Sequence, residues 1–305
     1  MALRILRPGP FSTIQDLGRR GYMQDGFPQS GVMDDYSFLQ ANRLLGNDKN
    51  AAAIEMTLMG LAAAFTEDTD FVAAGGDFGA ALDDIPIAPN TLYHAKTGAV
   101  LTFGAAKTGC RCYLAVAGGF DVPPVMGSRS TTVKCRIGGM DGRKLQSGDL
   151  LPIGKASCTP SPVGTQFDNP MPDDTLTIRA VPGPQDDLFT EEDLRLFFSQ
   201  VYTITPESDR MGMRLAGDTP LKGKRGTDII SDGIAFGAVQ VPSSGQPIVL
   251  MADRQTVGGY AKIATVISCD LHLLAQAKPA QTIRFVKTDL AEAVRTVHTY
   301  REALL

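Results

Sequence analysis

The sequence predicts a mainly β protein with a few helices and two domains. The chain has 305 residues, which exceeds the usual size of one hydrophobic core. Its 32 glycines and 19 prolines separate short apolar runs, a pattern typical of many short strands joined by tight turns. Such runs are found at residues 111–117, 175–179, 237–241 and 247–251.

Three segments carry the end signals of helices instead. Asp34 can cap a helix that runs to about Leu45, where Gly46 provides a C-terminal stop. Thr190 precedes three acidic residues, which suit the positive end of a helix dipole. A last helix begins at about Asp289, and we expect its apolar stripe to pack on the body of the protein. This stripe consists of Leu290, Val294, Val297 and Leu304.

A segment without periodicity separates two similar halves. Residues 156–174 are rich in Pro, Ser and Thr, as expected of a linker. The strand and turn at residues 3–10 recur at residues 176–184, although turn chemistry alone can produce such a recurrence. We predict a first domain of residues 1–155, a linker of residues 156–174, and a second domain of residues 175–305 that includes the last helix.

Composition and charge restrict the class of protein. The formal net charge is −4, without a long run of one sign, which argues against a nucleic-acid partner. No window approaches the roughly 18 unbroken apolar residues of a membrane-spanning helix, and residues 1–8 lack the features of a secretory signal. We therefore expect a soluble, cytoplasmic protein that does not bind a membrane.

Several standard reactive motifs are missing from the sequence. The five cysteines are scattered and the three histidines lie far apart, so neither a zinc site nor a histidine base is indicated. Residues 222–226 lack the spacing of a phosphate-binding P-loop, and residues 241–245 do not form a nucleophile elbow. No Met-Lys-Met segment occurs, so we expect no covalently attached biotin, and we predict no metal ligands in this chain. Catalysis would depend on carboxylates, arginines, amides and backbone N–H groups.

The densest cluster of such groups lies between residues 228 and 260. Glycines let backbone N–H groups approach an anion, and an arginine can hold a carboxylate through two hydrogen bonds. A buried aspartate beside an arginine can stay ionised and accept a proton from water. A solvated hairpin edge or an internal ion pair would give the same pattern, so these interpretations stay open. The candidate catalytic residues are Asp232, Gln246, Asp253 and Arg254, and the candidate substrate- or phosphate-binding residues are Arg210, Ser231, Gln240, Gln255, Thr256, Gly258 and Gly259.

Residues 231–242 and 245–260 resemble the signature of the biotin-dependent carboxyltransferase-type family. This family includes KipA-like proteins, chains called "allophanate hydrolase subunit 2", and the C subunit of bacterial 5-oxoprolinase. The resemblance implies two cyclophilin-like β-barrel domains. Phe236 departs from the pattern, because related chains often carry a smaller aliphatic residue there. The resemblance extends over residues 8–19, 30–34, 41–47, 55–57, 113–130 and 208–215.

The resemblance implies a C subunit of an ATP-dependent 5-oxoprolinase, which opens 5-oxo-L-proline to L-glutamate. Its expected partners are a KipI-like B subunit in direct contact and a LamB/YcsF-like A subunit, and we expect the chain to be inactive without them. ATP and Mg²⁺ would act at the level of the complex. Two alternatives are a biotin-dependent carboxyltransferase subunit, related to urea carboxylase and allophanate hydrolase, and a non-enzymatic KipA-type regulatory protein.

In the oxoprolinase interpretation the polar groups receive individual roles. Arg254 suits the substrate carboxylate or a phosphate, and Asp232 or Asp253 suits a base or a metal. Gln240 and Gln246 could orient the lactam, with the N–H groups of the paired glycines supporting an oxyanion. Polar residues in glycine turns of the first domain are expected to stabilise those turns or to have an interdomain role. These residues are Gln15, Asp16, Arg19, Asp34 and Arg129.

Overall fold

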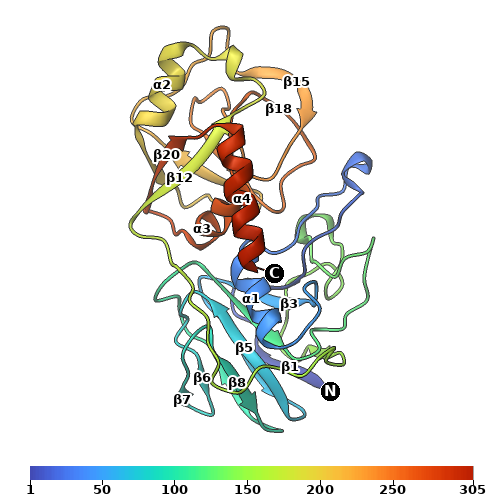
Figure 1. Ribbon diagram of the computed structural model, residues 1–305. Coiled ribbons are helices and arrows are strands. Elements are labelled where there is room, and N and C mark those ends of the chain that lie inside the picture. Colours follow the sequence, from blue (N-terminus) through green and yellow to red (C-terminus); the bar gives the residue numbers. More distant parts are fainter. Residues whose placement is uncertain (305) are drawn as a thin grey trace. The chain divides into compact units, whose positions relative to one another are not determined.

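The computed structural model describes residues 1–304, so the final residue of the predicted second domain lies outside the described part. The chain divides into two units, shown in Figure 1. The first contains Met1–Arg20 and Ser30–Met171, and the second contains Gly21–Gln29 and the chain from Pro172 onward. The segment Gly21–Gln29 therefore groups with the second unit, whereas the sequence suggested that it belongs to the first domain. The predicted domain boundaries themselves stay a prediction.

The first unit contains two antiparallel sheets. One is six-stranded, in the order β11-β1-β4-β9-β6-β7, and the other is five-stranded, in the order β2-β3-β10-β5-β8. Side chains from both sheets share one apolar cluster, so the sheets pack face to face. The strands are β1 (Ala2–Arg7), β2 (Ser12–Gln15), β3 (Ala53–Thr57), β4 (Ala62–Phe65), β5 (Thr69–Gly75), β6 (Ala81–Leu82), β7 (Ile85–Pro86), β8 (Leu92–Ala95), β9 (Val100–Thr102), β10 (Arg111–Val116) and β11 (Leu150–Pro152).

The helix α1 (Asp35–Leu44) covers the outer face of the five-stranded sheet. Strand β10 is buried along its whole length, because alternate side chains point into the cluster between the sheets and toward α1. The side chain of Asp34 accepts a hydrogen bond from the Ser37 N–H, so the predicted N-cap is confirmed. The predicted linker packs against the first unit through backbone hydrogen bonds. The N–H of Cys158 donates to the Gly46 carbonyl, and the N–H of Ser161 donates to the Leu44 carbonyl.

The second unit is built around a closed barrel in the order β12-β19-β16-β17-β14-β13-β20. The parallel pairing of β12 with β20 closes it. A separate two-stranded sheet, β15 (Asp228–Gly233) with β18 (Val257–Tyr260), is labelled in Figure 1. The barrel strands are β12 (Thr175–Pro182), β13 (Val201–Ile204), β14 (Gly212–Ala216), β16 (Ala238–Gln240), β17 (Ile248–Leu250), β19 (Lys262–Val266) and β20 (Thr282–Lys287).

Helix α2 (Glu191–Ser199) begins with the predicted cap. Thr190 and Asp193 form a reciprocal capping box, which satisfies N–H groups that the first helical turn leaves open. The apolar face of α2 packs on the barrel, where the ring of Phe197 stacks on that of Phe285 at 4.7 Å. The mainly β fold class is thus confirmed. Across residues 1–304 no helix is both long and apolar enough to span a membrane.

The last helix, α4 (Leu290–Leu304), packs through a face that includes Val297 of the predicted stripe but not Leu290 or Val294. Ala293, Val297 and Tyr300 contact an apolar cluster that also includes residues of the short helix η4 (Ser268–Asp270), next to α3 (Leu271–Gln276). In contrast, Leu290 and Val294 are 70% and 55% exposed. The prediction was wrong for these two residues, because the small Ala293 and the residues four and seven positions after it form the buried stripe.

Candidate functional site

The two-stranded sheet of β15 and β18 carries several of the predicted site residues. Asp232 lies opposite Gly258 in this pairing. The sheet is largely exposed, and the side chain of Ile230 is 94% accessible. It is anchored by Ile234, which is 3% exposed and packs against Ala238 and Leu250 of the barrel. This anchor places the glycine-rich strands beside the barrel strand β16.

A buried lysine lies next to Asp232. The side chain of Lys262, at the start of β19, is only 3% exposed, and its Nζ lies 3.1 Å from Oδ2 of Asp232. Gln185 links the two residues: its Nε2 donates to Asp232 at 3.2 Å and its Oε1 accepts from the Lys262 N–H at 3.2 Å. The Lys262 ammonium, followed by the Gly233 N–H, lowers the pKa of Asp232, so this carboxylate is ionised at neutral pH.

Neither Lys262 nor Gln185 was among the sequence-predicted site residues. The available signal for Lys262 was a charged side chain at the start of the apolar run at residues 261–267. A lysine is almost never fully buried unless it is paired. Nothing in the sequence near Gln185 indicates its role, because its partners are 47 and 77 positions away.

Two amide side chains and a glycine extend this group. Gln240, which is 2% exposed, lies opposite Lys262 in the β16–β19 pairing. Its Nε2 donates to the Tyr260 carbonyl at 3.3 Å, and its Oε1 lies 3.5 Å from Nε2 of Gln255. A Cβ atom on Gly258 would come within 2.7 Å of the Gln240 Nε2, so a larger residue would displace this amide group. We define the site cluster as Asp232, Lys262, Gln185, Gln240, Gln255 and Gly258.

Arg254 is connected to the site cluster through Ile234. The residue is 4% exposed, and its Nε donates to the Ile234 carbonyl at 3.1 Å. Its Nη2 contacts Oε1 of Gln29 at 3.3 Å and Sδ of Met23 at 3.9 Å. Burial lowers the pKa of Arg254 to about 10. The guanidinium carbon lies 5.4 Å from the centre of the Phe236 ring, so the aromatic residue that departs from the family pattern supports this cation.

Asp253 and Arg210 form an ion pair with each other. The register of β14 and β17 brings them together, and the Asp253 N–H also donates to the Arg210 carbonyl at 2.8 Å. The guanidinium grips the carboxylate through two bonds, Nε to Oδ2 at 2.9 Å and Nη2 to Oδ1 at 3.0 Å. Their side chains are 13% and 6% exposed. This is the internal ion pair that the sequence left open as an alternative to a catalytic role.

The structure places Gln246 at the other end of β17 from Asp253 and Arg254. Its side-chain amide forms two hydrogen bonds with the backbone of Gly217, at 2.7 and 3.1 Å. These bonds hold two chain segments together and do not join the site cluster. Three other predicted residues lie on or beside the exposed sheet: Ser231 on β15, Gly259 on β18, and Thr256 just before β18.

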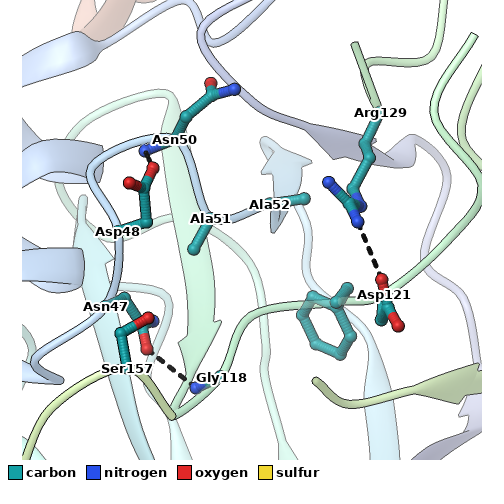
Figure 2. Close-up of a pocket in the computed structure, with 10 residues that line it drawn as sticks. Asn47, Asp48, Asn50, Ala51, Ala52, Gly118, Asp121, Arg129 and Ser157 are labelled. Atoms are coloured by element: carbon teal, nitrogen blue, oxygen red, sulfur yellow. Dashed lines mark hydrogen bonds and ion pairs between the residues drawn. The ribbon is translucent and has the colours of Figure 1, made fainter. Parts of the chain in front are cut away.

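A second polar region lies in the first unit. A cavity of about 220 Å³ is lined by the residues drawn in Figure 2, including Asn50, Asp48 and Arg129. The guanidinium of Arg129 is already paired with Asp121 at 2.7 Å. Asp16 is 1% exposed and fixes the adjacent turn by accepting a hydrogen bond from the Arg129 N–H at 2.6 Å. The predicted turn-stabilising role is therefore confirmed for Asp16.

Comparison with known proteins identifies the family. The model of the carboxyltransferase domain, subdomain A and B, matches residues 25–287. The chain belongs to this family. This carboxyltransferase-domain protein is 42% identical over 297 residues to the C subunit of 5-oxoprolinase from Escherichia coli (strain K12), covering 96% of this chain and 93% of that protein. It is 40% identical to the C subunit of 5-oxoprolinase from Haemophilus influenzae, covering 93% of this chain and 90% of that protein.

Solved structures agree with this assignment. The urea carboxylase of Kluyveromyces lactis is 31% identical, with a TM-score of 0.91 over 99% of this chain. The match covers only 29% of the urea carboxylase chain, so this protein spans less than a third of that larger protein. The family resemblance inferred from residues 231–242 and 245–260 is confirmed.

Proposed function

We propose that this chain is the C subunit of a 5-oxoprolinase, which opens 5-oxo-L-proline to L-glutamate together with partner subunits. The observation that carries the proposal is the match to the C subunit of the Escherichia coli 5-oxoprolinase, which extends over 96% of this chain and 93% of the relative. The urea carboxylase, in contrast, contains this fold as 29% of a longer chain. A match that is nearly complete on both sides favours the same position in the same kind of complex.

The site cluster offers groups that suit the opening of a lactam. A five-membered lactam is a stabilised amide, and coupling to ATP hydrolysis makes its opening favourable. The Lys262 ammonium and the Gln240 amide can donate to a carbonyl oxygen that gains negative charge, and their burial strengthens such contacts. Asp232 holds the Lys262 side chain in place. Its lowered pKa makes it a weak base, so we assign it the orientation of an attacking water.

Partner subunits complete the proposal. We propose a KipI-like B subunit in direct contact with this chain and a LamB/YcsF-like A subunit. Residues 1–304 contain no group of three His, Cys, Asp or Glu side chains arranged to hold a metal ion, and Asp253 is bound to Arg210. Within residues 1–304 there is therefore no Mg²⁺ site made of protein side chains alone. We assign ATP and Mg²⁺ to the assembled complex.

A second candidate function is biotin-dependent carboxyl transfer. The observation in its favour is the TM-score of 0.91 with urea carboxylase. In that reaction the same donors would stabilise the oxyanion formed as carboxybiotin delivers its carboxyl group. That reaction would also need a biotin carrier and a biotin carboxylase.

Co-expression with each partner set separates the two functions. We expect ATP hydrolysis and glutamate formation that depend on 5-oxoproline when the chain is purified with KipI-like and LamB/YcsF-like partners. Lys262→Met should lower this activity at least tenfold, because it removes the buried donor. Lys287→Met, at an exposed position of β20, is the matched control and should retain activity. Turnover only with a biotin carboxylase and a carrier would support the second candidate, and no turnover with either set would refute both.

A further inference from the structure

The segment Gly21–Gln29 contributes to the surroundings of Arg254, although its neighbours in sequence belong to the other unit. The segment is a compact turn. The short helix η1 (Met23–Asp25) is closed by Gly26 in the left-handed conformation, with a φ of 83°, and the Phe27 N–H donates to the Tyr22 carbonyl at 3.2 Å. This turn brings Gln29 within reach of a residue 225 positions later in the chain.

Arg254 has only neutral hydrogen-bond acceptors in the described part of the chain. These are the carbonyls of Ile234 and Met251, the Gln29 amide oxygen and the Met23 sulfur. Within residues 1–304 the guanidinium forms no ion pair with a carboxylate. Of its four contacts only the bond to Ile234, at 3.1 Å, falls in the usual range of N–H···O lengths. Arg210 is nearly as buried as Arg254 but has the Asp253 carboxylate on two of its nitrogens.

A buried cation without an anionic partner is a strong receptor for an anion. Removal of a charge from water is costly unless the charge is paired. A carboxylate or phosphate oxygen would supply that pairing, and a guanidinium binds both groups through charge-assisted hydrogen bonds. The amide oxygen of Gln29 accepts from Nη2 at 3.3 Å, as a carboxylate oxygen could, but it carries no net charge.

We infer that Arg254 receives a carboxylate or phosphate oxygen of a ligand, at the place where Nη2 contacts the Gln29 amide oxygen. Gln29 would then compete with the ligand for Arg254, and Met23 would lie beside it; both residues lie outside residues 228–260, where the candidates predicted from the sequence lie. The identity of the ligand rests on the proposed function. A 5-oxoproline carboxylate is expected if the chain is an oxoprolinase subunit, and inorganic phosphate mimics the alternative of a nucleotide-derived phosphate.

The substitution Gln29→Glu tests this inference, because it places a carboxylate where the ligand oxygen would bind. Binding of 5-oxoproline and, separately, of inorganic phosphate is measured by calorimetry, on the full chain and on the co-expressed complex. We expect at least one of the two to bind the natural chain, and Gln29→Glu to weaken that binding at least tenfold. Gln29→Ala should bind it as tightly as the natural chain or more tightly, since no group then competes for Arg254.

Gln24→Glu is the matched control. It makes the same change of charge in the same segment, at an exposed position, and should leave binding unchanged. In the active complex, Gln29→Glu should raise the KM for the anionic ligand and leave kcat within about twofold, whereas a general loss of structure would lower kcat.

Two outcomes overturn the inference: equal binding by the natural chain and Gln29→Glu, or no binding of either compound by the chain and by the complex. Binding of phosphate without 5-oxoproline would uphold the receptor role of Arg254 and count against the oxoprolinase proposal. The two ideas can therefore fail separately.

Discussion

Two buried arginines of the second unit should respond in opposite ways to the same substitution. Arg254→Met and Arg210→Met each remove a guanidinium that is less than a tenth exposed, at 4% and 6% respectively. Arg254 has neutral partners, whereas Arg210 holds the Asp253 carboxylate through two hydrogen bonds. Methionine preserves much of the volume and the unbranched shape, so the change in charge dominates the result.

The magnitude for Arg254 follows from its lowered pKa. Burial lowers the pKa of this guanidinium to about 10. An exposed guanidinium has a pKa above about 12 and each pKa unit corresponds to about 1.4 kcal/mol, so the charged form destabilises the folded state by about 3 kcal/mol at neutral pH. In Arg254→Met this gain is reduced by the loss of the hydrogen bond to Ile234 and of the contact with the Phe236 ring, each of which stabilises the folded state by about 1 kcal/mol. Arg254→Met should therefore stabilise the chain by about 1 kcal/mol.

Arg210→Met should change the free energy of unfolding in the opposite direction. Its removal leaves the Asp253 carboxylate, which is 13% exposed, without its cation. Breaking a buried pair from one side costs about 3 to 5 kcal/mol, and the partial exposure of Asp253 places the expected loss near the lower limit. Arg284→Met, at an exposed position of β20, should change the free energy of unfolding by less than about 0.5 kcal/mol.

Urea denaturation of the full chain at pH 7 measures these free energies of unfolding. The effect of Arg254→Met should also depend on pH. Because the folded-state pKa is lowered, the destabilisation is fully present below pH 10 and declines as the pH rises above that value. A loss of more than about 2 kcal/mol on Arg254→Met would refute the reasoning, because it would show that the neutral acceptors stabilise the cation by themselves.

Two further predictions concern stability. Gly118→Ala should destabilise the chain by about 3 kcal/mol or more in thermal denaturation, because Gly118 has a φ of 93° and an added Cβ would come within 2.1 Å of the Gly154 carbonyl oxygen. The control Gly148→Ala, with a φ of 89° and open space around it, should cost only about 1 kcal/mol. Equal losses of stability in the two variants would contradict the steric argument. Burial opposes the ionisation of Asp193, but hydrogen bonds led by that from Thr190 lower its pKa, so its contribution is present above about pH 4 and is lost as the pH falls. Asp193→Asn should cost about 1 kcal/mol at pH 7 and much less at pH 3, whereas an equal cost at both values would show that ionisation does not matter.

Local chemistry explains what could be predicted from the sequence. The caps at Asp34 and Thr190 depend on hydrogen bonds to residues three positions away, so a short window contains the whole interaction. The glycine-rich run at residues 228–260 was identified as the candidate surface, and the structure brings Asp232, Gln240 and Gly258 of that run together.

Partners that are distant in sequence explain what could not be predicted. Lys262 of the barrel is paired with Asp232 because the β15–β18 sheet lies beside the barrel. Gln29 contacts Arg254, which lies 225 positions later in the chain. The same limit applies to α4, where the choice between two apolar stripes depends on the surface that η4 and its neighbours present. Composition could not separate an ion pair such as Asp253–Arg210 from a catalytic pair, because both use the same side chains.

The sheet of β15 and β18 has a consequence for motion. Because each of its strands pairs with only one other strand, its amide protons should exchange with solvent faster than those of the barrel. The ion pair between Asp232 and Lys262 connects this sheet to the barrel. A ligand that binds Lys262 in place of Asp232 would break this connection, so ligand binding should increase the rate of local opening of residues 228–233.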